Sequence, residues 1–153
     1  MRAVVDTNIF LAGLLNADGG AAKIIRAFQD GKFELVVTRE VFDEYVRVIH
    51  LFDNDVPAHK SEELLELVFA KAYKVRPAAA RGLCSDADDE KFLTAALGGH
   101  ADFIVTKNKK HFPKAAASVR IANVREFLEE IEELRGNQHI FSTVKRKGAT
   151  GVR

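Results

Sequence analysis

Short runs of branched and aromatic apolar residues, each ending at polar residues, most constrain how this chain folds. The three clearest runs are Ala3–Val5, Phe33–Val37 and Phe103–Val105. They alternate with segments whose apolar residues recur at helical spacing, and they lack the polar alternation of a half-exposed strand. This pattern is typical of a parallel sheet covered by helices on both faces. Because ligands bind such sheets at the carboxyl ends of the strands, the residues just after these runs are the first functional candidates.

The remaining segments predict a series of helices and two shorter strands. Asn123 and Glu126 form a capping-box pattern at the start of the last predicted helix. The pair Gly98-Gly99 is expected to end the preceding helix in a left-handed turn. Apolar spacing predicts the earlier helices, over 9–15, 21–29, 39–49, 61–72 and 87–97. Two brief strands are expected over 74–76, which Pro77 closes, and over 119–121.

Length and composition indicate one folded domain. The chain has 153 residues, of which 47% are hydrophobic and 29% charged, so it can bury a substantial core. We assign this domain to residues 1–135. Residues 136–153 are polar, lack acids, and are expected to form a basic C-terminal tail containing Lys145, Arg146, Lys147 and Arg153.

Charge and cysteine content exclude several classes. The net charge of +1 gives no global basic field for nucleic acid, although a local patch would suffice. A single cysteine, Cys84, rules out an internal disulfide and a cysteine-based zinc site. Residues 1–6 lack the apolar segment of a signal peptide, and the apolar stretch 9–15 is too short to span a bilayer. We therefore expect a cytoplasmic protein without a membrane segment.

Two acids occupy positions with both a functional and a structural interpretation. Asp6 directly follows the first strand, where its carboxylate either works in a site or caps the next helix together with Thr7 or Asn8. Glu44 lies beside the apolar stripe of the helix predicted over 39–49, where an ion pair with Arg47 is the structural alternative. Neither residue alone decides between the two.

Four acids crowd the start of the helix predicted over 87–97: Asp86, Asp88, Asp89 and Glu90. Capping and the helix dipole account for one acid, so the others indicate either a bound cation or a solvated loop. Asp89 is followed by apolar residues at helical spacing, so we expect it near the side of the helix that packs against the core.

A basic loop follows the third strand. Lys107, Lys109 and Lys110 suit phosphate contacts, and they equally suit plain solvation. His111 has no histidine or cysteine partner at metal-binding spacing, so we assign it an auxiliary role at most.

Taken together, Asp6, Glu44 and Asp89 come from three segments that a parallel α/β fold can bring to one edge. Clustered carboxylates repel one another unless a cation lies between them. Oxygen ligands of this kind select Mg²⁺ or Mn²⁺. Such an ion activates water and neutralises charge on a phosphoryl group.

These segments resemble the motifs of PIN-domain proteins. Val4-Val5-Asp6-Thr7-Asn8 is similar to the first motif, and the segment 36–45 containing Glu44 to the second. The segment 85–96 containing Asp89 resembles the third, and 101–106 the strand before the fourth. The resemblance covers about residues 1–130 and is closest to the VapC-like toxin group. It implies a three-layer α/β/α fold with a central, mostly parallel twisted sheet.

The resemblance also implies a function. Members of this group are metal-dependent endoribonucleases that hydrolyse RNA phosphodiesters and serve as toxins of toxin–antitoxin pairs. Asp6, Asp89 and Glu44 would be the catalytic residues of an Mg²⁺ or Mn²⁺ site. Asp6 and Asp89 would bind the metal directly, Glu44 would bind the metal or orient its water, and Thr7 and Asn8 would support Asp6. Thr106 would line the site. The implied partners are an RNA substrate, a cognate antitoxin and a second copy in a homodimer.

One position departs from the family pattern. After Thr106 the family often has Gly-Asp, whereas this chain has Lys107-Asn108. Asn108 keeps an oxygen acceptor but loses the charge, which weakens a second metal position unless Asp86 or Asp88 compensates. The alternative function is a degenerate PIN domain that binds RNA or a protein partner without cleavage. A receiver-like domain is disfavoured because no acid pair follows the first strand, and a nucleotide-binding loop because there is no Walker lysine.

Overall fold

The computed structural model describes residues 1–114 and 118–148, with side chains up to Thr143 in the second stretch. In this part of the chain, five strands form one sheet in the order β3-β2-β1-β4-β5, and every pairing is parallel. The sheet predicted from the apolar runs is therefore confirmed. The strands are β1 (Arg2–Val5), β2 (Glu34–Val37), β3 (Tyr73–Lys74), β4 (Phe103–Val105) and β5 (Arg120–Ala122).

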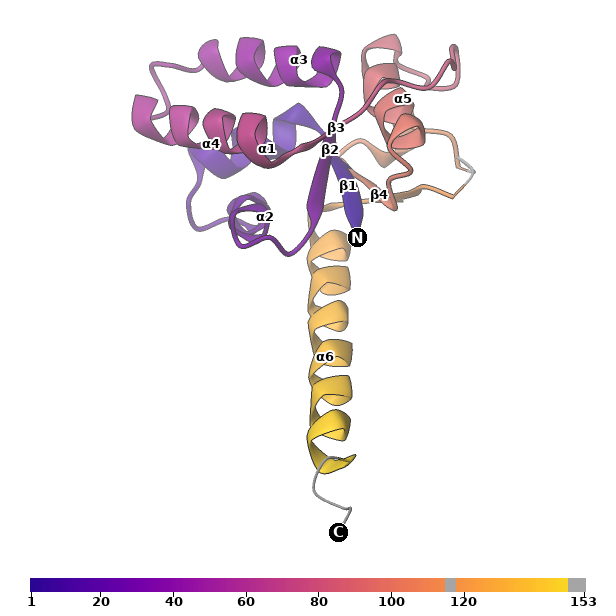
Figure 1. Ribbon diagram of the computed structural model, residues 1–153. Helices are drawn as coiled ribbons and strands as arrows, with labels where there is room; N and C mark the ends of the chain where they lie inside the picture. The colour runs from indigo at the N-terminus through magenta and orange to yellow at the C-terminus, as the bar shows by residue number, and fades with distance from the viewer. Residues whose placement is uncertain (115–117, 149–153) are drawn as a thin grey trace.

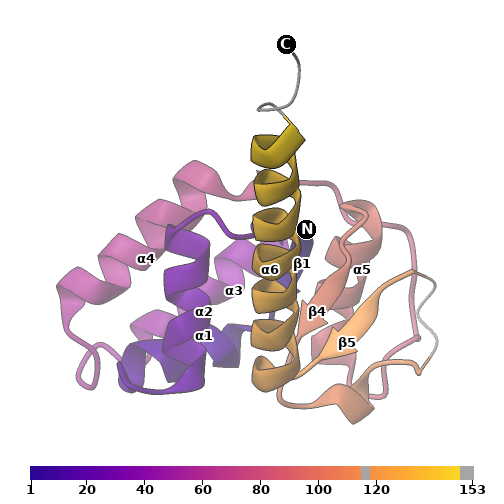
Figure 2. The same ribbon diagram turned by 90° about the horizontal axis from the view of Figure 1, so that it is seen from below.

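Helices cover both faces of this sheet, with α1 and α2 on one side and α5 on the other (Figure 1). Helix α5 packs against the central strands β1, β2 and β4, while the first turns of α6 pack against α2, β4 and β5 (Figure 2). The helices are α1 (Thr7–Leu15), α2 (Gly20–Gln29), α3 (Arg39–His50), α4 (Ala58–Lys71), α5 (Glu90–Gly98) and α6 (Val124–Gly148), with short 3₁₀ turns η1 (Ala87–Asp89) and η2 (Lys109–His111).

The base of α6 is anchored by aromatic packing. Phe127 is fully buried and meets Phe33 and Phe103 edge to face, with ring centroids 5.1 Å and 5.5 Å away. The predicted capping box is confirmed. The backbone amide of Asn123 donates to Glu126 Oε1 at 3.1 Å, and the backbone amide of Glu126 donates to Asn123 Oδ1 at 2.8 Å.

Helix α6 continues beyond residue 135, where we place the end of the domain, and extends to Gly148. An interior glycine such as Gly136 costs only about 1 kcal/mol of helix stability, and no proline follows it. Acids in the first half of α6 and bases in its last turns also complement the helix dipole. Of the expected basic tail, Lys145, Arg146 and Lys147 belong to this helix, their side chains lie outside the description, and Arg153 lies outside the described residues.

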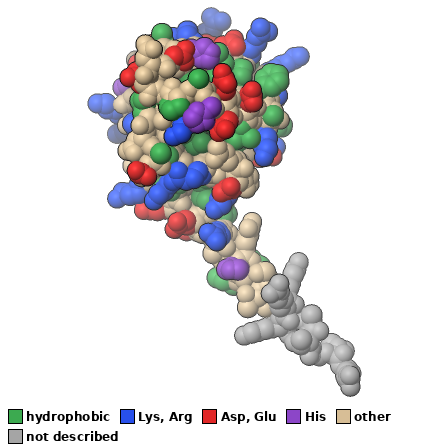
Figure 3. Space-filling model, turned by 90° about the vertical axis from the view of Figure 1, so that its left-hand side faces the viewer, with side chains coloured by type: hydrophobic (Ala, Val, Ile, Leu, Met, Phe, Trp, Pro, Cys, Tyr) green, Lys and Arg blue, Asp and Glu red, His purple; other side chains and the backbone are tan. Residues whose placement is uncertain are grey.

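The second half of α6 stands clear of the body (Figures 1 and 3). As far as Thr143 its side chains are exposed, including Ile140 at 63% and Phe141 at 72% of their full surface. Throughout residues 1–114 and 118–148, no helix combines the length and the apolar character needed to cross a bilayer.

The glycine pair at the end of α5 has a different structural role from the predicted left-handed turn. The left-handed residue is His100, with φ 49°, whereas Gly99 has φ −96°. A Cβ on Gly98 would lie 2.1 Å from the carbonyl oxygen of Arg76, and one on Gly99 would lie 2.5 Å from Val36 Cγ1. The two glycines are therefore required for close packing rather than for a left-handed turn.

Candidate metal-binding site

The carboxyl edge of the sheet brings polar residues together because the hydrogen-bond ladder continues past the strands. The Asp6 amide donates to the Val105 carbonyl at 2.9 Å, and the Thr106 amide donates to the Ala122 carbonyl at 2.9 Å. Asp6 and Thr106 are thus held side by side, and the Thr106 hydroxyl donates to Asp6 Oδ2 at 2.9 Å. This contact follows directly from the parallel register of β1 with β4.

Asp6 is a carboxylate held in an unfavourable electrostatic environment. Asp6 is only 5% exposed. As the N-cap of α1, its Oδ1 atom accepts a hydrogen bond from the backbone amide of Asn8 at 3.3 Å. Burial raises the pKa of Asp6, the charges of Asp89 and Glu44 raise it further, and the hydrogen bonds from Thr106 and Asn8 offset only part of this. Asp6 therefore combines both interpretations: it caps a helix and it would gain from a nearby cation.

Glu44 is held in place by a partly buried cation, Lys91. Its side chain, 14% exposed, lies 2.7 Å from the Nζ atom of Lys91, which is 15% exposed. Thr7 donates its hydroxyl to the other carboxylate oxygen of Glu44. The expected partner Arg47 is more distant, at 3.9 Å. Lys91 was not among the predicted site residues: it lies within the third motif, but no local pattern shows that it contacts Glu44, 47 positions away.

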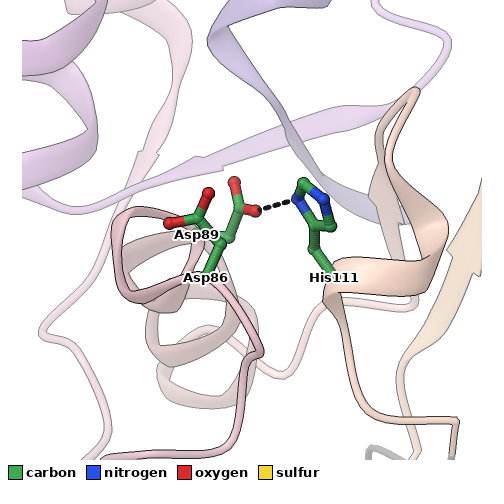
Figure 4. A group of neighbouring side chains, drawn as sticks. All are labelled: Asp86, Asp89 and His111. Carbon is green, nitrogen blue, oxygen red and sulfur yellow. Dashed lines mark hydrogen bonds and ion pairs between the residues drawn. The ribbon is translucent and has the colours of Figure 1, made fainter.

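Asp89 contacts His111, a residue for which we expected only an auxiliary role. His111 Nδ1 lies 2.8 Å from Asp89 Oδ2, and Asp86 accepts the Asp88 amide at 3.0 Å as the cap of η1. Ligand atoms of Asp86, Asp89 and His111 all lie within 4.8 Å of one another (Figure 4). No second group of three or more such ligands occurs in the described part of the chain. The partners of His111 are thus two carboxylates and not the histidine or cysteine expected from metal-binding spacing.

The predicted acids line one pocket of about 280 Å³ at this edge of the sheet. Larger grooves of about 640 and 550 Å³ lie elsewhere, but the acids that line them are all exposed. The lining residues of the acidic pocket are Asp6, Thr7, Asn8, Glu44, Val48, Asp86, Asp88, Asp89, Phe92, Asn108 and His111.

The predicted lysines lie outside this lining. Lys109 Nζ is paired with Glu126, at 2.8 Å and 3.2 Å from its two carboxylate oxygens, and this pairing lowers the pKa of Glu126. Lys107 and Lys110 are exposed. Between them along the chain, the backbone amide of Asn108 donates a hydrogen bond to Thr106 Oγ1 at 3.1 Å.

The donor set of the pocket fits a divalent cation. Carboxylate oxygens are the preferred ligands of Mg²⁺ and Mn²⁺, and the buried carboxylate of Asp6 has no cationic partner of its own among the described residues. Cys84 contributes nothing to this chemistry, because burial and neighbouring carboxylates raise the pKa of its thiol to about 11.

Comparison with known proteins identifies the family. The PIN domain model matches residues 2–110, which is well over half of the chain, so the chain belongs to the PIN-domain family. A chain in the crystal structure of VapBC2 from Rickettsia felis, bound to a DNA fragment from their promoter, has the same fold. It is 14% identical, has a TM-score of 0.51, and the match covers 80% of this chain and 98% of that one. No curated protein matches the sequence.

Proposed function

We propose that the protein is a metal-dependent endoribonuclease and the toxin of a toxin–antitoxin pair. The observation that carries this proposal is the buried carboxylate of Asp6, which shares one pocket with Glu44 and Asp89. Membership of the PIN-domain family and the fold shared with a VapBC2 chain support it. A bound Mg²⁺ or Mn²⁺ ion would supply Lewis acidity, lowering the pKa of water and neutralising charge on the phosphoryl group.

The side chains around this ion divide the remaining work. Asp6 and Asp89 would hold it, while Thr106 and Asn8 fix the orientation of the Asp6 carboxylate through their hydrogen bonds. Glu44, oriented by Thr7 and Lys91, accepts a hydrogen bond from the attacking water and takes up its proton.

The surrounding loop contributes substrate binding. Lys107 and Lys110 are exposed beside Asn108, so their ammonium groups can meet RNA phosphates at the mouth of the pocket. Lys109 instead ties the loop to the first turn of α6 through Glu126. The proposed partners are a cytoplasmic antitoxin protein, whose basic side chain would compete with the metal in the acidic pocket, and a second copy of the chain.

Cleavage of a mixed pool of structured and single-stranded RNAs tests this proposal. The wild type, Asp6→Asn and the control Asp43→Asn would be assayed with Mg²⁺, with Mn²⁺ and with chelator. Asp43 lies next to Glu44 on α3 but is exposed and lines a different groove. Cleavage by the wild type and the control, absent in Asp6→Asn and in chelator, is expected. Full activity of Asp6→Asn would refute the assignment.

A second candidate function is RNA binding without cleavage. Two features favour it. The ammonium of Lys91 already neutralises the charge of Glu44, and the uncharged Asn108 adds no carboxylate ligand for a metal. Fluorescence anisotropy with the same RNAs separates the two candidates. RNA binding by the wild type with no cleavage under any metal condition would select the binding function.

A further inference from the structure

We propose that Asp86, Asp89 and His111 form a second metal position, which shares Asp89 with the ion at Asp6 and prefers transition-metal ions such as Mn²⁺ to Mg²⁺. The sharing rests on the proposed function, whereas the ligand set itself is read from the geometry. In this chain the ligands that compensate for Asn108 are thus one carboxylate and one imidazole.

The three groups converge from two separate segments. Asp86 and Asp89 lie at the two ends of the η1 turn, and His111 reaches them from η2 (Figure 4). One ligand atom from each lies within 4.8 Å of the others, so one ion between them could contact all three. Asp89 and His111 are partly buried and held together at 2.8 Å, while Asp86 is exposed and completes the set from the solvent side.

Charge balance directs a second cation to this side of the pocket. At Glu44, the ammonium of Lys91 lies 2.7 Å from the carboxylate and repels a second ion there. Asn108 offers an amide oxygen without charge. Among the described residues, Asp86 forms no ion pair with a lysine or arginine, so its charge is left for a cation.

The imidazole determines which ion is preferred. Mg²⁺ binds almost wholly through oxygen and retains several waters. Imidazole nitrogen suits transition-metal ions, and a mixed set with two carboxylates also suits the harder ones such as Mn²⁺. A position built from these three residues should therefore bind Mn²⁺ more tightly than Mg²⁺, with nitrogen directly attached to the metal.

Electron spin echo envelope modulation on the Mn²⁺-loaded full chain tests this directly. The wild type should show nitrogen hyperfine coupling, and His111→Gln should lose it. The matched control is His59→Gln, which removes an exposed histidine on α4 outside the pocket and should retain the coupling. Calorimetric titration should show two Mn²⁺ ions per wild-type chain. His111→Gln should raise the Kd of the weaker ion by about 10-fold or more.

A second variant protects the test against misfolding. Asp86→Asn retains a capping side chain for η1 and changes an exposed residue, so it should fold normally while weakening the same Mn²⁺ ion. Absence of nitrogen coupling in the wild type, coupling that survives in His111→Gln, or an unchanged titration in Asp86→Asn would each overturn the proposal. None of these results would affect Asp6-dependent cleavage in Mg²⁺, so failure of this proposal differs from failure of the nuclease proposal.

Discussion

Replacing Lys91 by Met removes the cation that compensates Glu44 and keeps much of the aliphatic volume. The Lys91 and Glu44 side chains are 15% and 14% exposed, with their charged atoms 2.7 Å apart. After the substitution, Glu44 keeps the hydroxyl of Thr7 and the more distant guanidinium of Arg47, at 3.9 Å. We expect a less stable chain in the absence of metal and a stronger stabilisation by added metal than in the wild type.

The size of the loss follows from the geometry. Two unit charges at this separation attract by about 6 kcal/mol at an effective dielectric constant of about 20. Removing one partner of a fully buried pair costs about 3–5 kcal/mol, because the other charge stays buried. Here Thr7, Arg47 and partial solvent access compensate some of that charge, so we expect a loss of about 1–3 kcal/mol. For a chain of this length that corresponds to a fall in Tm of roughly 2–12 °C.

Chemical denaturation in chelator, combined with a double-mutant cycle, measures this effect. Lys91→Met, Glu44→Gln and the double variant should show a positive coupling, with the double variant less destabilised than the sum of the single ones. The control Lys107→Met removes an exposed lysine outside the pocket and should change the stability by less than about 0.5 kcal/mol. Additive losses, or a Lys91→Met chain as stable as the control, would refute the argument.

Three further predictions concern Asp6 and two glycines. Because burial and neighbouring carboxylates raise the folded-state pKa of Asp6, the metal-free wild type should lose stability as the pH rises from the ordinary carboxyl pKa to that raised value, and Asp6→Asn should not. Denaturation of both chains in chelator across that range checks this, and equal pH profiles would contradict it. Gly98→Ala should destabilise the fold by about 1–3 kcal/mol, since its Cβ would meet a backbone oxygen at 2.1 Å. Gly136→Ala, with open space around its Cβ, should instead raise helicity by circular dichroism, at about 1 kcal/mol in favour of the helix.

The sheet and the three acids could be predicted because they depend on local pattern. Val4-Val5 and Phe103-Ile104-Val105 form buried parallel strands, and the residues that follow them must meet at one edge. The pairing of Asp6 with Thr106 is a direct consequence of that register. That these acids bind a metal or cleave RNA stays a prediction.

The lysine and the histidine of the site could not be found in this way. Lys91 and Glu44 are 47 positions apart, and His111 and Asp89 are 22 apart, so neither pair belongs to a local pattern. Helical spacing places Lys91 on α5 but does not say which helix its ammonium faces across the pocket. The length of α6 beyond residue 135 was not predicted either, because the charge distribution that favours it extends over the whole helix rather than over a local pattern.

Charge balance links the metal count to Lys91. With Glu44 paired with Lys91 and an uncharged residue at position 108, the carboxylates of the pocket left for cations are Asp6, Asp86, Asp88 and Asp89. Removing Lys91 would free Glu44 as a ligand for the proposed ion at Asp6 and leave the His111 side of the pocket unchanged. Lys91→Met should therefore tighten the first Mn²⁺ ion while the nitrogen coupling from His111 persists. Loss of that coupling in Lys91→Met would mean that the two metal positions are not separate.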